Sequence, residues 1–474
     1  MSFGELLLKV KDAVWGVPLI VLILSAGILL TVKTGFIQVR RLPLALKYLF
    51  HEEDSDAKGE VSGFASLCTA LSATIGTGNI VGVATAIGVL AGGPGALFWM
   101  WVAAFFGMAT KYAEGFLAVK YRTIDSEGHV LGGPFYYIEN GMGQKWKWLA
   151  KLFAFFGACV GLMGIGTFSQ VNGISSAVTN FFDPNGENTI KIFGMDYSIV
   201  TVITAFALAI FAGLVIIGGI KRISGVSQII VPFMAILYVL AVIVLLVTNF
   251  TKIPTAFGEI IKGAFGIKPI AGSAVASIMI SMRNGVARGV FSNESGLGSA
   301  PIAAAAAKTK EPVRQGLISM TGTFIDTIII CTMTGLSIIM MGSWQDESLQ
   351  GVEVTTDAFS RGLSFLPSSA ASFILMICLV FFAFTTILGW NYYGERCLEY
   401  LSGKNKTAIM VYRALYILAV FIGPYMTVSA VWTIADIFNG LMAFPNLVAL
   451  FALNKIIAKD TEHYFRRLER RRRQ

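Results

Sequence analysis

A cluster of glycine and polar residues interrupts an apolar segment in the first quarter of this chain. The run Ser72–Gly82 reads SATIGTGNIVG and contains three glycines, two threonines and an asparagine. A second apolar segment carries the run RNGVARG at Arg283–Gly289. Irregular backbone at membrane depth survives only where protein or a wet cavity covers its N–H and C=O groups. Two such interruptions in corresponding halves of a chain indicate the binding site of a membrane transporter.

The composition places the whole chain in a membrane. Of its 474 residues, 55% are hydrophobic and 14% are charged, whereas a soluble domain has about 25% charged residues. A helix that crosses about 30 Å of hydrocarbon needs roughly 20 residues. We therefore predict an all-α polytopic membrane protein with eleven transmembrane helices, at 14–33, 62–90, 94–119, 149–180, 196–219, 225–249, 270–300, 315–341, 370–394, 407–425 and 430–454.

The distribution of lysine and arginine predicts the orientation. If the loop at 34–61 is cytoplasmic, most of the 37 basic residues fall on the cytoplasmic side, as the positive-inside rule requires. We expect a multi-pass protein of the cell inner (plasma) membrane with its N-terminus outside and its C-terminus in the cytoplasm. The basic tail Arg466–Gln474 is interpreted as a topology signal that attracts anionic lipids, and not as a nucleic-acid-binding segment.

The histidines, the cysteines and the catalytic motifs of the sequence limit the functions that this chain can have. The three histidines, His51, His129 and His463, lie in predicted cytoplasmic stretches, which leaves none at membrane depth for a proton relay. None of the five cysteines lies in a predicted outer loop, so no disulfide framework is implied. The sequence contains neither H-E-x-x-H nor G-x-S-x-G, and we expect a protein that is not an enzyme.

The first interruption offers both ends of a broken helix to one ligand. The free N–H groups that begin the outer half favour a carboxylate. The free carbonyl groups that end the inner half, near Ser72–Ile75, suit a small cation or an ammonium group. An amino acid carries both charges, so we expect its binding residues to include Gly76, Thr77, Gly78 and Asn79.

Two other interpretations apply to these glycines. Gly78 and Gly82 have the G-x-x-x-G spacing of a close-packing face between helices, and this role is compatible with a site. A nucleotide-binding loop is excluded, because the spacing G-x-G-x-x-x-G is one residue too long and no strand precedes it.

Two longer runs carry a family resemblance. The run Gly92–Gly107, GGPGALFWMWVAAFFG, resembles the signature of the sodium:alanine symporter family, also called the alanine or glycine:cation symporters. The run Arg283–Ala307, RNGVARGVFSNESGLGSAPIAAAAA, resembles the second hallmark of that family. The resemblance covers nearly the whole chain.

The resemblance implies a leucine-transporter-like fold, with two inverted five-helix repeats and one additional N-terminal helix. It also implies uptake of alanine or glycine driven by sodium, which is the coupling ion, with no other cofactor. The corresponding regions are an N-terminal helix with an amphipathic linker at 1–60, the first repeat at 61–250, the second repeat at 251–455 and the basic tail at 456–474.

Resemblance to the wider fold also places one sodium ion. Its ligands would be the carbonyl groups of Ser72 and Ile75 and the hydroxyl groups of Thr385 and Thr386. Hard cations prefer oxygen ligands. The alternative for either threonine is a hydrogen bond to its own helix.

Further polar and aromatic residues are candidates for the substrate pocket. Gln170 is an amide close to midmembrane, with Asn172 as an equal competitor, and both could instead bond to a neighbouring helix. The candidates at the second break are Ser281, Asn284 and Gly285. Trp390, one turn beyond Thr386, would either wall the pocket or serve only in packing.

Charged residues within the predicted helices need partners. Arg283 and Arg288 are expected to pair with Asp326 or Glu294, because an ion pair is the common fate of a membrane-embedded charge. Lys111 and Glu114 lie three residues apart and are expected to pair with each other.

Sodium symport of alanine or glycine by alternating access is therefore the predicted function. The alternatives are a proton-coupled amino-acid carrier, a sodium symporter for serine or glutamine, and a passive channel. The paired breaks favour a closed central site over an open pore.

Overall fold

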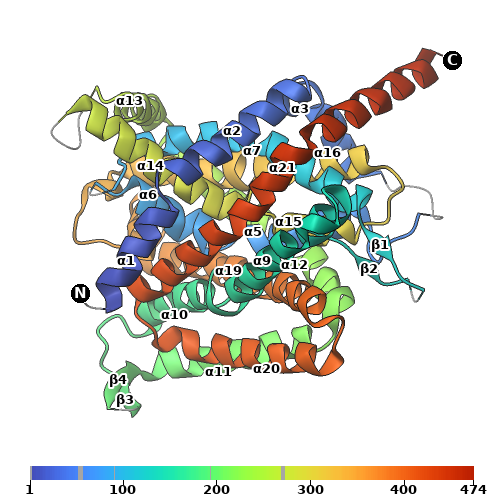
Figure 1. Cartoon of the computed structure of the whole chain (residues 1–474). Coiled ribbons are helices and arrows are strands. Elements are labelled where there is room, and N and C mark those ends of the chain that lie inside the picture. Colours follow the sequence, from blue (N-terminus) through green and yellow to red (C-terminus); the bar gives the residue numbers. More distant parts are fainter. Residues whose placement is uncertain are drawn as a thin grey trace.

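The computed structural model is almost entirely helical and describes residues 3–51, 57–89, 91–126, 128–192, 194–267 and 273–473 (Figure 1). The elements of the first half are α1 (Phe3–Val14), α2 (Val17–Lys33), α3 (Ile37–Arg40), α4 (Leu42–Leu49), α5 (Gly63–Thr74), the π-helical turn η1 (Gly78–Gly82), α6 (Val83–Ile87), α7 (Gly95–Lys120), β1 (Thr123–Ile124), β2 (Val130–Leu131), α8 (Pro134–Tyr136), η2 (Tyr137–Gly141), η3 (Gln144–Trp146), α9 (Lys147–Met163), α10 (Phe168–Phe182), β3 (Thr189–Ile192), β4 (Met195–Ser198), α11 (Ile199–Ile216) and α12 (Gly219–Thr248).

The second half continues with helices alone in the described residues. Its elements are η4 (Phe250–Lys252), α13 (Ile253–Ala264), α14 (Ala274–Asn293), α15 (Ala300–Ala305), α16 (Pro312–Thr323), the π-helical segment η5 (Phe324–Cys331), α17 (Thr332–Met341), η6 (Ser343–Gln345), α18 (Val352–Gly362), α19 (Ser368–Ser402), α20 (Lys406–Ile422), η7 (Gly423–Tyr425) and α21 (Val428–Arg473). The strands form two small antiparallel hairpins, with Thr123 opposite Leu131 in one and Thr189 opposite Ser198 in the other.

The described residues contain eight helices long and apolar enough to cross a membrane, or nine if a bent pair counts as one span. The all-α polytopic fold is therefore confirmed, whereas the predicted number of eleven spans is not. The helices α7 and α14 occupy the predicted spans 94–119 and 270–300 but are not among the eight. Both carry charged side chains, which lowers their hydropathy.

The first predicted break is confirmed. Helix α5 begins at Ser62, whose hydroxyl caps it by accepting a hydrogen bond from the Ala65 N–H at 3.1 Å. It ends at Ile75, which has extended backbone with φ −78° and ψ 94°. The chain resumes as η1 and α6, bent by 53° from α5. The glycine and polar cluster thus separates two half-helices.

The second break does not lie at 283–289, where the sequence analysis placed it. Helix α14 runs through that segment without interruption and ends at Asn293. Glu294 then adopts a left-handed conformation, with φ 57°, and the short helix α15 follows from Ala300. Gly285 serves packing instead, since a Cβ atom there would lie 2.3 Å from the Ala96 carbonyl oxygen of α7.

A third break was not predicted. The expected span 149–180 divides into α9 and α10, with Gly164 to Thr167 between them. A Cβ atom at Gly166 would lie 2.6 Å from both the Gly161 carbonyl oxygen and the Trp390 Cβ atom. The absence of a side chain therefore lets this connection lie directly against α19.

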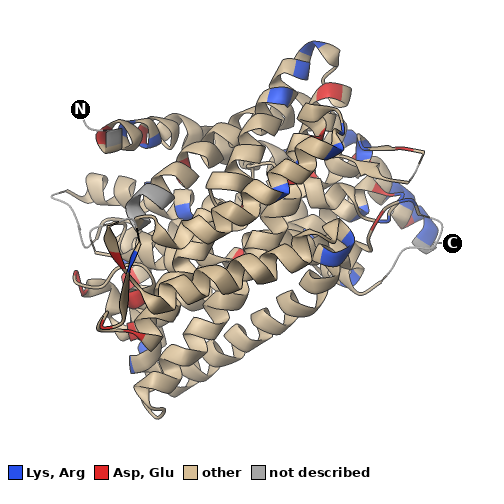
Figure 2. Cartoon of the chain, turned by 90° about the horizontal axis from the view of Figure 1, so that it is seen from below, with Lys and Arg blue, Asp and Glu red and all other residues tan. Residues whose placement is uncertain are grey.

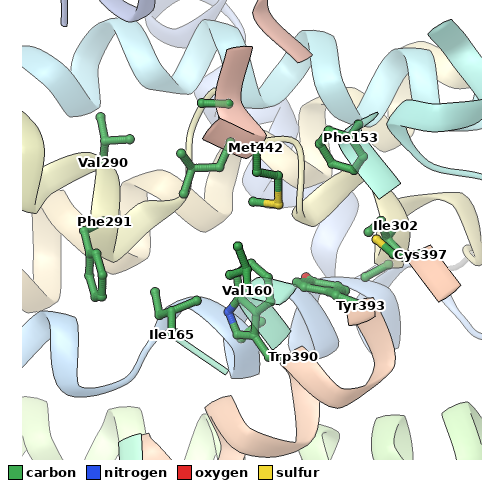
Figure 3. Close-up of a cluster of buried hydrophobic side chains, with 14 of the residues drawn as sticks. Phe153, Val160, Ile165, Val290, Phe291, Ile302, Trp390, Tyr393, Cys397 and Met442 are labelled. Carbon is green, nitrogen blue, oxygen red and sulfur yellow. The ribbon is translucent and has the colours of Figure 1, made fainter. Parts of the chain in front are cut away.

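The core around these breaks is formed by α9, α14, α19 and α21. Figure 3 shows Trp390 and Tyr393 of α19 beside Val160 of α9 and below Met442 of α21. Phe291 of α14 lies in the same cluster, and all five side chains are buried. Burial of these aromatic and aliphatic surfaces holds the broken segments in place.

Charged residues gather at the two ends of the helical body. Figure 2 shows a middle part that is nearly free of charge, and lysine and arginine concentrated toward the end where the C-terminus lies. Helix α21 runs the length of the body and extends past α3 (Figure 1). The basic tail therefore projects beyond the apolar part of the molecule.

Candidate functional site

The first break meets α10 and α19 at Gly76. The backbone N–H of Thr77 donates a hydrogen bond to Oε1 of Gln170 at 3.0 Å. A Cβ atom at Gly76 would lie 2.5 Å from Oγ1 of Thr386 and 2.8 Å from Oε1 of Gln170. Glycine is therefore required for this close approach, and the structure brings together Gly76, Thr77 and Gln170, three of the expected substrate-site residues.

Gly78 and Asn79 connect the first break to the second broken helix and to η5. A Cβ atom at Gly78 would lie 3.2 Å from the Cα atom of Ser292. Oδ1 of Asn79 accepts a hydrogen bond from the Gly76 N–H at 2.9 Å, and Nδ2 donates to Oδ1 of Asp326 at 2.7 Å. Asn79 therefore fixes the loop and joins it to a carboxylate.

Asp326 is the acidic residue at the centre of this arrangement. It is fully buried and accepts hydrogen bonds from the hydroxyl groups of Ser292 at 2.8 Å and Thr327 at 2.7 Å, besides the one from Asn79. No lysine or arginine of the described residues forms an ion pair with it. Three elements thus supply hydroxyl or amide donors to one buried carboxylate.

The expected partners of the two arginines of α14 were wrong. Nη2 of Arg283 lies 2.7 Å from Oδ1 of Asp12 near the N-terminus. Both terminal nitrogens of Arg288 donate to the carboxylate of Asp436 on α21 at 3.2 Å. The Arg288 guanidinium also lies 5.0 Å from the ring centre of Trp432. Both ion pairs lie outside the Asp326 cluster.

The second break is held by α7 and α21. Oε1 of Glu114 accepts hydrogen bonds from the N–H groups of Gly296 at 3.1 Å and Gly298 at 3.2 Å. It accepts another from Nδ2 of Asn446 at 2.7 Å. Glu114 therefore binds the loop instead of pairing with Lys111 as predicted, and it satisfies backbone groups that no helix can satisfy.

Lys111 and Trp390 complete this support. Nζ of Lys111 donates to the carbonyl of Asn293, the last residue of α14, at 2.8 Å. Nε1 of Trp390 donates to Oε1 of Glu294 at 2.8 Å, and the Ser299 hydroxyl donates to Oε2 at 2.5 Å. Glu294 is thus bound within the break and does not pair with the arginines of α14. Trp390 joins α19 to the second break.

Of the two threonines of α19, only Thr386 contacts the first break. Oγ1 of Thr386 lies 3.2 Å from the Ile75 carbonyl oxygen and 3.0 Å from that of Phe382. Oγ1 of Thr385 is bonded within its own helix to Phe382 at 3.0 Å and lies 3.5 Å from the Met234 sulfur of α12. The predicted sodium role of Thr385 has no geometric support.

Ser72 lies in the last turn of α5. Its hydroxyl donates to the Thr69 carbonyl at 2.8 Å. Carbonyl groups in a last helical turn, such as that of Ser72, have no partner within the helix, and the carbonyl of the C-cap Ile75 accepts a hydrogen bond from Thr386. Carbonyl oxygens of α5 and the Thr386 hydroxyl therefore form the candidate cation site.

Other predicted site residues lie elsewhere. The Ser281 hydroxyl donates to the Gly92 carbonyl at 2.5 Å, and half-buried Asn284 and Gly285 lie beside the same loop and α7. Nδ2 of Asn172 donates to the Met426 carbonyl at 3.0 Å. These residues pack helices against each other and do not line the central breaks.

The half-helices α5 and α15 are joined at their far ends. Val61, before α5, forms a parallel bridge with Ala307, after α15, and the Lys308 N–H donates to the Val61 carbonyl at 2.7 Å. The Arg122 guanidinium donates to the carbonyl groups of Lys58, Ala305, Ala307 and Thr309. One cation therefore binds the ends of both half-helices.

A histidine lies beside this junction. Nδ1 of His129 is 3.0 Å from Oε1 of Glu60, and Nε2 is 2.9 Å from Oε1 of Glu399. Hydrogen bonds to Glu399 and Glu60 raise the pKa of His129 to about 9, against the opposing effects of burial and of Arg396. The β1–β2 hairpin, the chain before α5 and the end of α19 thus meet at one ionisable ring.

Sequence reasoning missed several of these residues. Asp326 was considered only as a partner for arginine, and Ser292 was not singled out. Asn446 lies in an apolar helix, where a lone amide carries only a weak signal. The signal that could have identified Asp326 was an acidic side chain at midmembrane with no evident basic partner.

The fold and the central site define a membrane transporter of the leucine-transporter-like class, because two discontinuous helices expose backbone at the middle of an all-α polytopic bundle. A solved structure described as MhsT in complex with L-phenylalanine has the same fold, with a TM-score of 0.56 at 13% identity over 85% of this chain and 98% of that chain.

The chain belongs to the sodium:alanine symporter family, whose model matches residues 2–474. It is 47% identical over 470 residues to the sodium/alanine symporter AgcS of Methanococcus maripaludis, covering 98% of both chains. It is 37% identical over 458 residues to the probable sodium/glutamine symporter GlnT of Bacillus subtilis, covering 96% of this chain and 89% of that protein.

Proposed function

We propose that this protein takes up alanine, and also glycine, by symport with sodium through alternating access. The observation that carries the proposal is the hydrogen bond between the Thr77 N–H and Oε1 of Gln170 at 3.0 Å. An acceptor oxygen already occupies the position at which the outer half-helix would hold a substrate carboxylate. Substrate binding then exchanges the Gln170 oxygen for a carboxylate oxygen.

The coupling ion is proposed to bind beside the substrate. Carbonyl oxygens of Ser72 and Ile75 and the hydroxyl of Thr386 suit a hard cation. Asp326 provides a buried negative charge that a sodium ion would neutralise. Asn79 bonds to both Asp326 and Gly76 and so connects this carboxylate to the loop at the first break. A cation bound at that break would order the loop that receives the amino acid, which is positive linkage between the two ligands.

Alternating access would require both ends of the central site to open in turn. On one side the Arg288–Asp436 ion pair lies over the aromatic ring of Trp432. On the other side Arg122 and the Val61–Ala307 bridge join the half-helices α5 and α15. We propose that the Arg288–Asp436 ion pair and the Val61–Ala307 bridge break in turn, so that the site opens to one side at a time. The repeats at 61–250 and 251–455 would then move relative to each other.

The proposed orientation places the C-terminus in the cytoplasm of a cell limited by the inner (plasma) membrane. Lysine and arginine concentrate at that end of the molecule (Figure 2), in agreement with the positive-inside rule. Anionic lipids would gather around the basic tail at Arg466–Gln474, and we expect no nucleic-acid partner.

The decisive experiment is uptake of radiolabelled alanine into proteoliposomes. We expect accumulation under an inward sodium gradient, its loss when choline replaces sodium, and competition by glycine. Stronger competition by serine or glutamine would change the substrate assignment. Uptake that does not saturate would indicate a passive channel and contradict the proposal.

A proton-coupled carrier remains the second candidate, because a buried carboxylate such as Asp326 can bind a proton as well as sodium. The same vesicles distinguish the two. Uptake that follows an imposed pH gradient in choline buffer would assign the coupling to protons.

A further inference from the structure

A cationic cleft lies away from the central site and is lined by residues of the end of α2, of α3 and of the far part of α21. These three elements are labelled in Figure 1. Its volume is about 550 Å³. Six of its lining side chains are basic and two are acidic: Lys33, Arg40, Arg41, Lys455, Lys459 and Arg466, with Glu462 and Glu469. The cleft therefore has a large excess of positive charge.

Both acidic residues are already neutralised. Glu469 lies 3.2 Å from Nη2 of Arg41, and Glu462 forms an ion pair with Arg466, one turn along α21. Within the described part of the chain, Lys33, Lys455 and Lys459 form no ion pair, and Arg40 contacts only the Gly35 carbonyl at 3.5 Å. Four cations thus face one cleft without a protein anion.

The geometry of the cleft is fixed by its walls. Gly35 and Phe36 both have positive φ, at 66° and 57°, and they turn the chain from α2 into α3. The Arg41 guanidinium lies 4.1 Å from the ring centre of Phe465, a buried residue of α21. Basic side chains of α2 and α3 are consequently held opposite those of α21.

Apolar side chains are exposed on the same elements. Val32 of α2 is 61% exposed, Phe36 is 49% exposed and Val39 of α3 is 58% exposed. Val32 belongs to the end of a helix that is apolar enough to span a membrane, and Phe36 and Val39 follow it in the turn and in α3. The surface therefore combines a cationic cleft with an adjoining apolar patch, which matches a molecule with an anionic head and hydrocarbon tails.

We propose that this cleft binds the phosphate group of one anionic phospholipid, whose acyl chains lie along Val32 and Phe36. The site is distinct from general attraction to the basic tail, because four cations with no protein anion converge on one volume. A zwitterionic lipid would bring its own ammonium group into this cluster and would bind less well. The inference does not depend on which amino acid is transported.

Native mass spectrometry of the full chain tests the proposal. The protein is incubated with equal amounts of phosphatidylglycerol and phosphatidylcholine, and retained lipids are counted. We expect one tightly held phosphatidylglycerol molecule on the unmodified chain. In a variant with Lys33→Gln and Lys459→Gln, its affinity should fall about tenfold, which corresponds to ~1.4 kcal/mol.

A matched control separates the cleft from overall charge. Lys221→Gln with Lys308→Gln removes the same two charges from exposed lysines outside the cleft, and should leave the bound lipid unchanged. Equal lipid loss in both double variants, or none in the cleft variant, would overturn the proposal. The single variants Lys33→Gln and Lys459→Gln, on opposite walls, serve if the double variant does not fold, and each should give partial loss.

A comparison with soluble phosphate compounds distinguishes a lipid from a free phosphate as the ligand. If inorganic phosphate or glycerol 3-phosphate raises the thermal stability of the unmodified chain as much as phosphatidylglycerol does, the ligand is a free phosphate and the lipid proposal fails. Stabilisation by phosphatidylglycerol alone supports it.

Discussion

The hydroxyl of Thr386 lies 3.2 Å from the carbonyl oxygen of Ile75, although 311 residues separate them in the sequence. This contact joins the last residue before the first break to the middle of α19. The neighbouring Thr385 is equally buried but faces α12. Two adjacent, identical residues therefore occupy different environments, which makes each the natural control for the other.

Replacement of Thr386 by valine should weaken sodium activation. Valine keeps the shape and removes one oxygen, so the sodium concentration for half-maximal uptake should rise about tenfold, or ~1.4 kcal/mol. The Thr385→Val variant should retain the unmodified sodium dependence. Equal shifts in both variants would remove Thr386 from the proposed cation site.

Replacement of Gln170 should change the binding of the amino acid and not that of sodium. In Gln170→Ala the Thr77 N–H loses its acceptor, so the substrate carboxylate no longer has to displace an oxygen and the KM for alanine should fall about tenfold at saturating sodium. Gln170→Glu would place a fixed negative charge there and repel a substrate carboxylate, so uptake should be nearly lost. Asn172→Ala, which removes an amide bonded to Met426, should leave KM unaltered.

Asp326→Asn should abolish sodium-driven uptake while leaving the fold intact. The change keeps the size of the side chain but removes the negative charge that would neutralise the cation, and a loss of about a hundredfold is on the order of 3 kcal/mol. Equilibrium binding of labelled alanine at increasing sodium measures the effect. Asp346→Asn, at an exposed position, is the control, and an Asp326→Asn variant with normal sodium dependence contradicts the role.

Thermal stability in detergent should decrease as pH rises toward and beyond 9. The folded-state pKa of His129 is raised from 6.5 to about 9, so the charged ring is stabilised by the fold. This contribution is complete below pH 6.5 and is lost as pH rises through about 9. A His129→Gln variant should show a flatter melting-temperature profile in that window. An identical slope in both proteins would assign the alkaline loss to other groups.

Local composition was sufficient to locate the first break, because Gly76, Gly78 and Asn79 interrupt an otherwise apolar run. The same reasoning failed at the second break. Glycines within an apolar helix can either break it or admit a neighbour, and Gly285 admits Ala96 of α7. Sequence alone does not distinguish the two uses.

Long-range contacts explain the remaining differences. The turn after Asn293 is held by Lys111 and Glu114 of α7 and by Asn446 of α21. These residues are far away in the sequence, and the pairing of Lys111 with Glu114 was the simpler local expectation. The break between α9 and α10 had a local signal in Gly164 and Gly166, which the length of the apolar run obscured.

The bridge between Val61 and Ala307 joins the half-helices α5 and α15 for as long as it is closed. A displacement imposed on α5 at the first break is transmitted directly to α15, and from there to the loop at the second break. An ion and an amino acid bound at the first break would thus also act on the second break through this bridge. Opening of the bridge would release α5 from α15, so the state of this bridge would decide whether binding at one break reaches the other.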